Sequence, residues 1–257
     1  MAREAKRWLL TAVALGMVLG TASDGVGEEY KPPRKVPGIR PCPRFAGPSR
    51  RVMDHGREAI EMVTKMNVDV DGAPNAYGPP GKKALDIAEH SLSPADAEHP
   101  GAVVGYMTEY EGGPPTVQKP GDPYPGYYVS QTDFADKDNP RMEDPRRYVD
   151  ATKINYLVQG RVARKAGVVM GDYATVYSCR TGKSAFAIVA DSGNERGDEG
   201  SLALVQALGY PIKDGIDQSV DDPEIVIHYF PKSNPGKTFF KTQAALDEAA
   251  AKLGLRK

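Results

Sequence analysis

The chain has 257 residues, of which 40% are hydrophobic, a length that suits one large domain or two small ones. Its 33 Lys and Arg residues nearly balance 34 Asp and Glu residues, for a formal net charge of -1 at pH 7. So small a net charge provides no general basic field, which argues against a nucleic-acid partner.

The first residues have the pattern of a secretory signal peptide. Basic residues within the first seven positions precede an apolar run over residues 8–19, and small residues follow at 20–22. The run is shorter than the ~20 apolar residues that a membrane-spanning helix needs. We therefore expect residues 1–22 to be cleaved, leaving a secreted monomer, extracellular or periplasmic, with no membrane attachment.

Residues 23–50 are rich in Pro, Gly and charge, which predicts an extended arm or linker before a main domain over residues 51–257. The chain has two cysteines, Cys42 and Cys179. In an oxidising compartment the expected state of such a pair is one disulfide, which would tie the arm to a strand. Two buried free thiols are the alternative, and two distant cysteines do not suit a structural zinc site.

The predicted elements begin with a helix over residues 53–66, where Ile60 and Val63 are spaced as in a helix and Asp54 suits its start. Short runs rich in β-branched and aromatic residues then predict strands. These runs are residues 67–70, 102–107, 127–132, 156–159, 168–178, 184–190 and 224–230. The proline-rich loop over residues 108–126 is expected to lack regular structure and to wall a cleft.

Two late segments predict helices, one over residues 199–209 and one over residues 242–254. Each ends on a glycine, and Thr242 suits the start of the second. Strands outnumber helices and do not alternate with them, so we expect an α+β fold. Its core would be a mainly antiparallel sheet or barrel with a few flanking helices.

Several kinds of catalytic site lack their motifs. The four histidines form no HxxxH or HExxH spacing, and the chain has neither a GxSxG motif nor a glycine-rich phosphate loop. Residues 67–78 imitate a calcium loop through Asp69 and Asp71, but Gly78 stands where such a loop needs a glutamate. We therefore expect no metal and no cofactor, and an Asp-Gly turn is the simpler interpretation of Asp71 and Gly72.

Two acidic residues flank a glycine-containing turn between apolar segments, in "AIVADSGNERGDEGSLALVQALG". Asp191 would end a strand and Glu199 would start a helix, and such different surroundings separate the pKa values of two carboxyl groups. Glycoside hydrolysis uses a pair of this kind, one acid and one base or nucleophile. On spacing alone, a turn residue at Asp191 and a helix cap at Glu199 are the favoured interpretation, because acidic turns are common.

Several segments in this order resemble the chitosanases of glycoside hydrolase family 75. They are "VDVDGAPNAYG", "YYVSQTDF", "RYVDATKINYLV", "GVVMGDYATVY", the acidic segment above and "IHYFPKS", and together they cover roughly residues 55–235. The sequence departs from the family pattern at Asn194 and Asp198, where proline and glycine are usual, and at Asn155, where the family has I-P-Y. The turn before Glu199 is thus expected to be shortened or rearranged.

The resemblance implies a secreted endo-hydrolase that cleaves β-1,4-linked glucosamine polymers with inversion. It implies Asp191 and Glu199 as the catalytic pair. We expect Glu199 to be the acid and Asp191 the base, with the roles open to exchange and Asp198 as a rival of Glu199. Chitosan is a polycation, so carboxylates and aromatic rings are expected to bind it. The candidates are Asp69, Asp71, Tyr128, Asp133, Tyr148, Asp150 and Ser201.

Two alternatives remain at the level of the sequence. One is a non-catalytic cell-envelope or polysaccharide-binding protein on the same scaffold, and the other is a hydrolase of another amino-sugar polymer.

Overall fold

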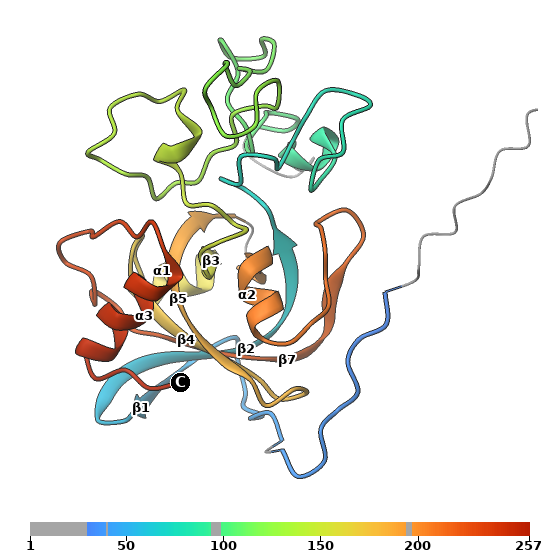
Figure 1. The fold of residues 1–257 in the computed structure, drawn as a ribbon. Helices are drawn as coiled ribbons and strands as arrows, with labels where there is room; N and C mark the ends of the chain where they lie inside the picture. Colours follow the sequence, from blue (N-terminus) through green and yellow to red (C-terminus); the bar gives the residue numbers. More distant parts are fainter. Residues whose placement is uncertain (1–29, 40, 94–98, 194–196) are drawn as a thin grey trace, which may run out of the picture.

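The computed structural model describes residues 30–39, 41–93, 99–193 and 197–257, and their core is a closed β-barrel (Figure 1). One sheet has the strand order β1-β2-β6-β3-β5-β4-β7, and an additional pairing of β2 with β7 closes it. The strands are β1 Arg50–Asp54, β2 Arg57–Asp69, β3 Tyr156–Gln159, β4 Tyr173–Ser178, β5 Ser184–Ser192, β6 Glu199–Ser201 and β7 Ser219–Tyr229. The pairings β2–β6 and β3–β5 are parallel, and the other five are antiparallel. The expected α+β fold with a barrel-like core is confirmed.

Three short α-helices accompany the barrel in the described part of the chain: α1 Arg161–Lys165, α2 Leu202–Ala207 and α3 Gln243–Lys252. Two 3-10 turns, η1 Ala88–Ser91 and η2 Pro145–Arg147, lie in the loops. The predicted helix over residues 242–254 is confirmed as α3. Its cap is Thr242, whose hydroxyl accepts a hydrogen bond from the Ala245 N–H at 3.3 Å, and Gly254 follows it with a φ of 76°.

The predicted helix over residues 53–66 is wrong, because this segment forms a β-hairpin. His55 and Gly56 both have positive φ angles, 48° and 83°, and connect β1 to β2. Two left-handed residues in a row suit the tight turn of a hairpin, and they interrupt a helix. β2 then pairs along its length with β1, β7 and β6, so tertiary pairing outweighs the helical spacing of Ile60 and Val63.

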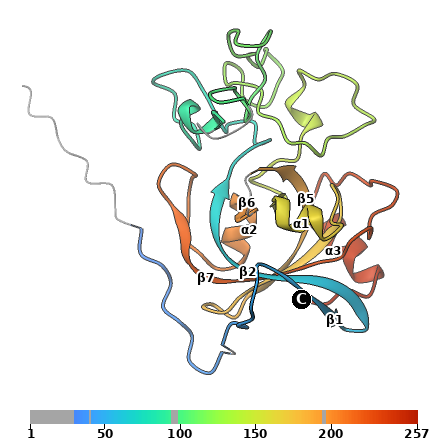
Figure 2. The ribbon, with the colours of Figure 1, turned by 180° about the vertical axis from the view of Figure 1, so that it is seen from behind.

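Two predicted strands over residues 102–107 and 127–132 are also wrong. These runs make isolated bridges, such as Tyr106 with Ser130, and no continuous ladder. They belong to a long, loop-rich segment over residues 70–155 that covers one end of the barrel (Figures 1 and 2). The proline-rich residues 108–126 contain no helix or strand, as expected. The runs at 156–159 and 184–190 are confirmed as β3 and β5.

Large apolar side chains fill the barrel. Tyr156, Leu157, Ile188, Leu204 and Tyr229 each have less than 2% of their surface exposed. Four of them come from strands, Tyr156 and Leu157 from β3, Ile188 from β5 and Tyr229 from β7, and Leu204 comes from α2. Burial of a side chain of this size stabilises the fold by roughly 1.5–3 kcal/mol.

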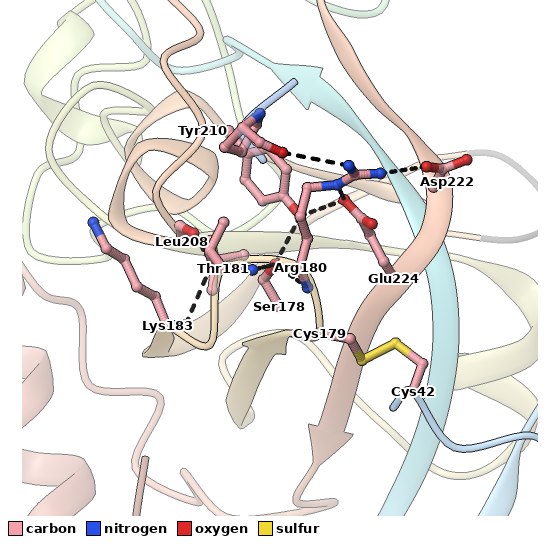
Figure 3. Close-up of polar contacts among 11 residues, drawn as sticks. Cys42, Ser178, Cys179, Arg180, Thr181, Lys183, Leu208, Tyr210, Asp222 and Glu224 are labelled. Atoms are coloured by element: carbon pink, nitrogen blue, oxygen red, sulfur yellow. Dashed lines mark hydrogen bonds and ion pairs between the residues drawn. A yellow bond between two sulfur atoms is a disulfide. The ribbon is translucent and has the colours of Figure 1, made fainter. Parts of the chain in front are cut away.

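The arm before β1 is joined covalently to the barrel, as Figure 3 shows. Cys42 forms a disulfide with Cys179, in the turn between β4 and β5, with a Cα–Cα distance of 5.4 Å. The neighbouring Arg180 carbonyl accepts a hydrogen bond from Val36 N–H at 3.0 Å, and its guanidinium binds the carboxylates of Asp222 and Glu224. The predicted disulfide is therefore confirmed.

The expected signal peptide, residues 1–22, lies outside the described residues. Among the helices that are described, none is both long and apolar enough to cross a membrane.

Candidate active site

The ends of β2 and β5 lie at the same end of the barrel, beneath the loop-rich segment (Figures 1 and 2), with β6 and β3 between them in the sheet. Asp69 is the last residue of β2, and Asp191 is the second-last residue of β5. The chain turns immediately after Asp69, so that Asp71 also faces this end of the barrel. Oxygen atoms of the carboxylates of Asp69, Asp71 and Asp191 all lie within 4.8 Å of one another. We call these three residues the acidic cluster.

Hydrogen bonds to the backbone and to two buried tyrosines hold Asp69 and Asp71 in place. The Oδ1 atom of Asp69 accepts a bond from the Asp71 N–H at 2.7 Å. The Tyr77 hydroxyl donates to Asp71 Oδ1 at 2.8 Å, and the Tyr156 hydroxyl donates to the Asp71 carbonyl at 2.9 Å. The two carboxylates are therefore positioned before any ligand arrives.

The turn after Asp71 needs a glycine. Gly72 has a φ of 74°, and a Cβ atom there would lie 2.2 Å from the carbonyl oxygen of Val149. Its N–H donates to Ser130 Oγ at 3.0 Å. The expected Asp-Gly turn is therefore present, and the close approach of the 149 backbone fixes its path.

Asp191 is held by backbone donors on both sides. Its Oδ1 atom accepts bonds from the N–H of Ser192 at 2.8 Å and from the N–H of Asp133 at 3.2 Å. The Asp133 carboxylate in turn accepts a bond from the Ser192 hydroxyl. The structure thus brings Asp133, one of the expected binding residues, directly to the acidic cluster.

Glu199 does not start a helix, contrary to the sequence-based expectation. It is the first residue of β6 and lies opposite Asn67 of β2 in a parallel pairing. The helix α2 begins three residues later, and Ser201 caps it by accepting from the Leu204 N–H at 3.2 Å. A Cβ atom on Gly193 would lie 2.9 Å from Glu199 Oε2, so the Glu199 carboxylate is next to the end of β5.

The surroundings raise the pKa of all four carboxyl groups. Burial is the largest cause at each one. For Asp69 the pKa rises to about 6, with Asp71 and Tyr156 opposing through hydrogen bonds. The pKa values of Asp71 and Asp191 are raised well above the usual range, because Asp69 adds its charge to burial at both. The pKa of Glu199 rises to about 7, through burial, Asp69 and Asp198.

The remaining expected binding residues are spread over three places. Ser201 has no exposed surface, and its hydroxyl bonds to backbone groups: it accepts from the N–H of Leu204 and of Tyr156, the latter at 3.0 Å, and donates to the Ile154 carbonyl at 2.8 Å. The half-buried Tyr128 packs on Tyr106, with 5.0 Å between ring centroids, and Tyr106 packs on Tyr77 at 5.5 Å. Ser201 is thus placed as a structural residue, while Tyr128 is two rings away from Asp71.

Tyr148 and Asp150 line a separate hollow of about 520 Å³, together with Asp136 and Phe240. The Tyr148 hydroxyl donates to the Met142 carbonyl at 2.8 Å, and the Asp150 carboxylate binds Lys153 Nζ at 2.6 Å. The acidic cluster does not line this hollow.

Sequence reasoning missed Tyr77, Tyr156 and Lys65. The two tyrosines lie inside the quoted family-like segments, but no spacing rule marks a tyrosine as the partner of a distant aspartate. Lys65 lies on β2, in the segment expected to be helical, and its ammonium group is 3.8 Å from Asp198 Oδ2. The three carboxylates of the acidic cluster are hard oxygen ligands of the kind that suits a small cation. Their mutual distances alone do not identify a metal.

Replacing Asp69 by asparagine is expected to stabilise the protein at pH 8 but not at pH 4. The folded pKa of Asp69, about 6, exceeds its usual value of 3.8, so the folded state holds the proton more tightly and loses stability as pH rises through this window. Asparagine keeps the acceptor oxygen and removes the charge, for a gain of roughly 1–3 kcal/mol above pH 6. Thermal unfolding at pH 4 and pH 8 measures the difference, with the exposed Asp217→Asn as control; equal effects at both pH values would contradict it.

Comparison with known proteins adds no family to this description: no model of a protein family matches the chain, and no curated protein matches it.

Proposed function

We propose that the protein is a secreted glycoside hydrolase that cleaves chitosan or a related polymer of β-1,4-linked glucosamine. The observation that carries this proposal is the meeting of Asp191 with Asp69 and Asp71 at one end of the barrel, with Glu199 beside the end of β5. The resemblance of the sequence to family 75 chitosanases supports the same function, although the turn before Glu199 departs from that pattern.

The charge state of the acidic cluster supports a cationic substrate. Three carboxylates so close together repel one another, which raises the pKa of Asp71 and Asp191 beyond the effect of burial. A glucosamine polymer carries ammonium groups, and a bound ammonium group stabilises ionised carboxylates. Binding of the substrate would therefore favour the ionised forms of Asp71 and Asp191, against the effect of burial and of their acidic neighbours.

The surroundings of the two catalytic candidates support distinct roles. A pKa of about 7 keeps Glu199 protonated in mildly acidic solution, as an acid that protonates the leaving oxygen needs. Asp191 would then take a proton from water while the water oxygen bonds to the anomeric carbon and the glycosidic C–O bond breaks. Glu199 lies in a strand and not in the first turn of a helix, so no helix dipole lowers its pKa.

A reducing-sugar assay on chitosan, chitin and peptidoglycan tests the proposal. We expect release of reducing ends from chitosan, with activity declining as pH rises above about 7 because Glu199 loses its proton. Activity on peptidoglycan alone would identify another amino-sugar hydrolase. If the protein binds one of the three polymers but hydrolyses none of them, the proposed enzyme activity is wrong and the protein is a polysaccharide-binding protein.

The stereochemistry of the reaction gives a second test. An inverting mechanism requires about 6.5–9.5 Å between the carboxyl groups of Asp191 and Glu199, so that a water molecule fits. We expect the α-anomer to appear first from a β-linked chitosan oligomer in a proton NMR time course. Initial release of the β-anomer would establish retention and contradict the proposed roles.

A further inference from the structure

We propose that Lys65 and Asp198 are positioning residues that act as an opposed pair on Glu199, with Asp198 favouring its protonated form and Lys65 favouring its ionised form. The inference rests on the proposed function for its catalytic consequence, since Glu199 is there the acid. The resemblance to known chitosanases does not supply it, because Asp198 stands where that pattern has glycine.

Asp198 is built into the barrel beside Glu199. Only 3% of its surface is exposed, and its carbonyl accepts a hydrogen bond from the Asn67 N–H at 2.8 Å. This bond continues the parallel pairing in which Asn67 lies opposite Glu199. The backbone of Asp198 is therefore held by β2 one residue before Glu199, and its side chain is buried there.

Lys65 approaches the same place from β2. Its ammonium nitrogen lies 3.8 Å from Asp198 Oδ2, and 40% of its side chain is exposed. This distance is at the outer limit of an ion pair, and the Lys65 charge also acts on the neighbouring Glu199. The pKa of Glu199 responds to both, since Asp198 raises it and Lys65 lowers it.

Among the causes of the Glu199 pKa shift in the described part of the chain, Lys65 is the group that lowers the pKa, and its charged neighbours are mostly acidic. The charge of Asp69 on β2 raises the pKa of Glu199. The charge of Glu199 in turn raises the pKa of Asp71, in the turn after β2. On the side of β3 and β5, the end of the Glu199 side chain meets Gly193, which is also close to Val158. Asp191 near the end of β5 is acidic as well, so the positive charge of Lys65 opposes the rise in the pKa of Glu199 that burial and acidic neighbours cause.

Two substitutions with opposite expected effects test the pair. Lys65→Met removes the positive charge and is expected to move the titration midpoint of Glu199 upward from about 7. Asp198→Asn keeps the size of the side chain and is expected to move the midpoint downward. A shift on the order of one pH unit is expected in each case, as for a neighbouring charge.

The readout is the ¹³C carboxyl resonance of Glu199 in the full chain, identified by its disappearance in Glu199→Gln. Lys252→Met, which removes a lysine paired with Glu248 on α3, and the exposed Asp217→Asn are the matched controls. Shifts in opposite directions, absent from the controls, support the pair. No shift in either variant, or shifts in the same direction, would overturn it.

The pH dependence of chitosan hydrolysis separates this inference from the proposed function. If both hold, the alkaline limb of the activity profile follows the two titration midpoints. If the midpoints shift while wild-type protein hydrolyses no polymer, the pair stands and the proposed function fails. If the protein hydrolyses chitosan, but neither the titration midpoint of Glu199 nor the alkaline limb of the activity profile moves in the two variants, the proposed role of Lys65 and Asp198 is refuted and the proposed function stands.

Discussion

Neutralising either catalytic carboxyl group is expected to reduce chitosan hydrolysis by roughly 10²–10⁴-fold, the usual contribution of a general acid or base. Asp191→Asn keeps the oxygen that accepts from the N–H groups of Ser192 and Asp133, so the loss would come from the missing base and not from the end of β5. Glu199→Gln removes the proton donor while leaving the β6 backbone in place. The measurement is kcat on soluble chitosan, with circular dichroism to verify folding.

The matched controls are Asp217→Asn and Glu248→Gln, at exposed positions outside the site. Both are expected to retain the wild-type rate. Asp198→Asn is expected to stay active, with the altered pH dependence described above, because Asp198 is paired with Lys65 and not placed at the acidic cluster. Near-normal hydrolysis by Glu199→Gln would remove Glu199 from the mechanism, and an inactive but folded Asp198→Asn would put Asp198 in its place.

Loss of the disulfide is expected to have the largest effect on stability. Cys42 and Cys179 are 137 positions apart in the chain, so their link strongly restricts the unfolded state. A loop of this length corresponds to roughly 5 kcal/mol in the chain-entropy model. At about 2–4 °C per kcal/mol for a domain of this size, the melting temperature would fall by roughly 10–20 °C.

Cys42→Ser tests the link more cleanly than a change at Cys179. Cys42 is half-buried in a largely exposed arm, whereas Cys179 is 3% exposed, so that Cys179→Ser would place a hydroxyl in the core. The variant and reduced wild-type protein are expected to melt at similar temperatures, both below the oxidised protein. The disulfide contributes little if reductant leaves the melting temperature of the wild-type protein unchanged and Cys42→Ser melts at the same temperature.

The secondary structure around Asp191 was predictable from the neighbouring residues, whereas that of Glu199 depended on tertiary pairing. The apolar run before Asp191 predicted a strand that ends at the site, and β5 does so because β-branched and aromatic residues suit a buried strand in many contexts. Glu199 was assigned to a helix because the apolar spacing of the following residues is helical. The helix exists but starts at Leu202, since the parallel partner β2 extends residues 199–201 into a strand.

The sequence by itself determined the features that depend on neighbouring residues or on composition. These are the α+β class, strands β3 and β5, the helix α3 with its Thr242 cap, and the pairing of the two cysteines. The β1–β2 hairpin was decided by the tertiary structure, because strands on both sides of β2 supply hydrogen bonds that a single segment cannot reveal.

Only the tertiary structure decided the chemistry of the candidate site. Asp71 and Asp191 are 120 positions apart (191 − 71), and closure of the barrel brings their carboxylates within 4.8 Å. The pKa of a carboxyl group depends on its burial and on charges a few ångströms away. Those neighbours come from β2, β5, β6 and the loop-rich segment, so the raised pKa values follow from the fold and not from the spacing of Asp191 and Glu199 along the chain.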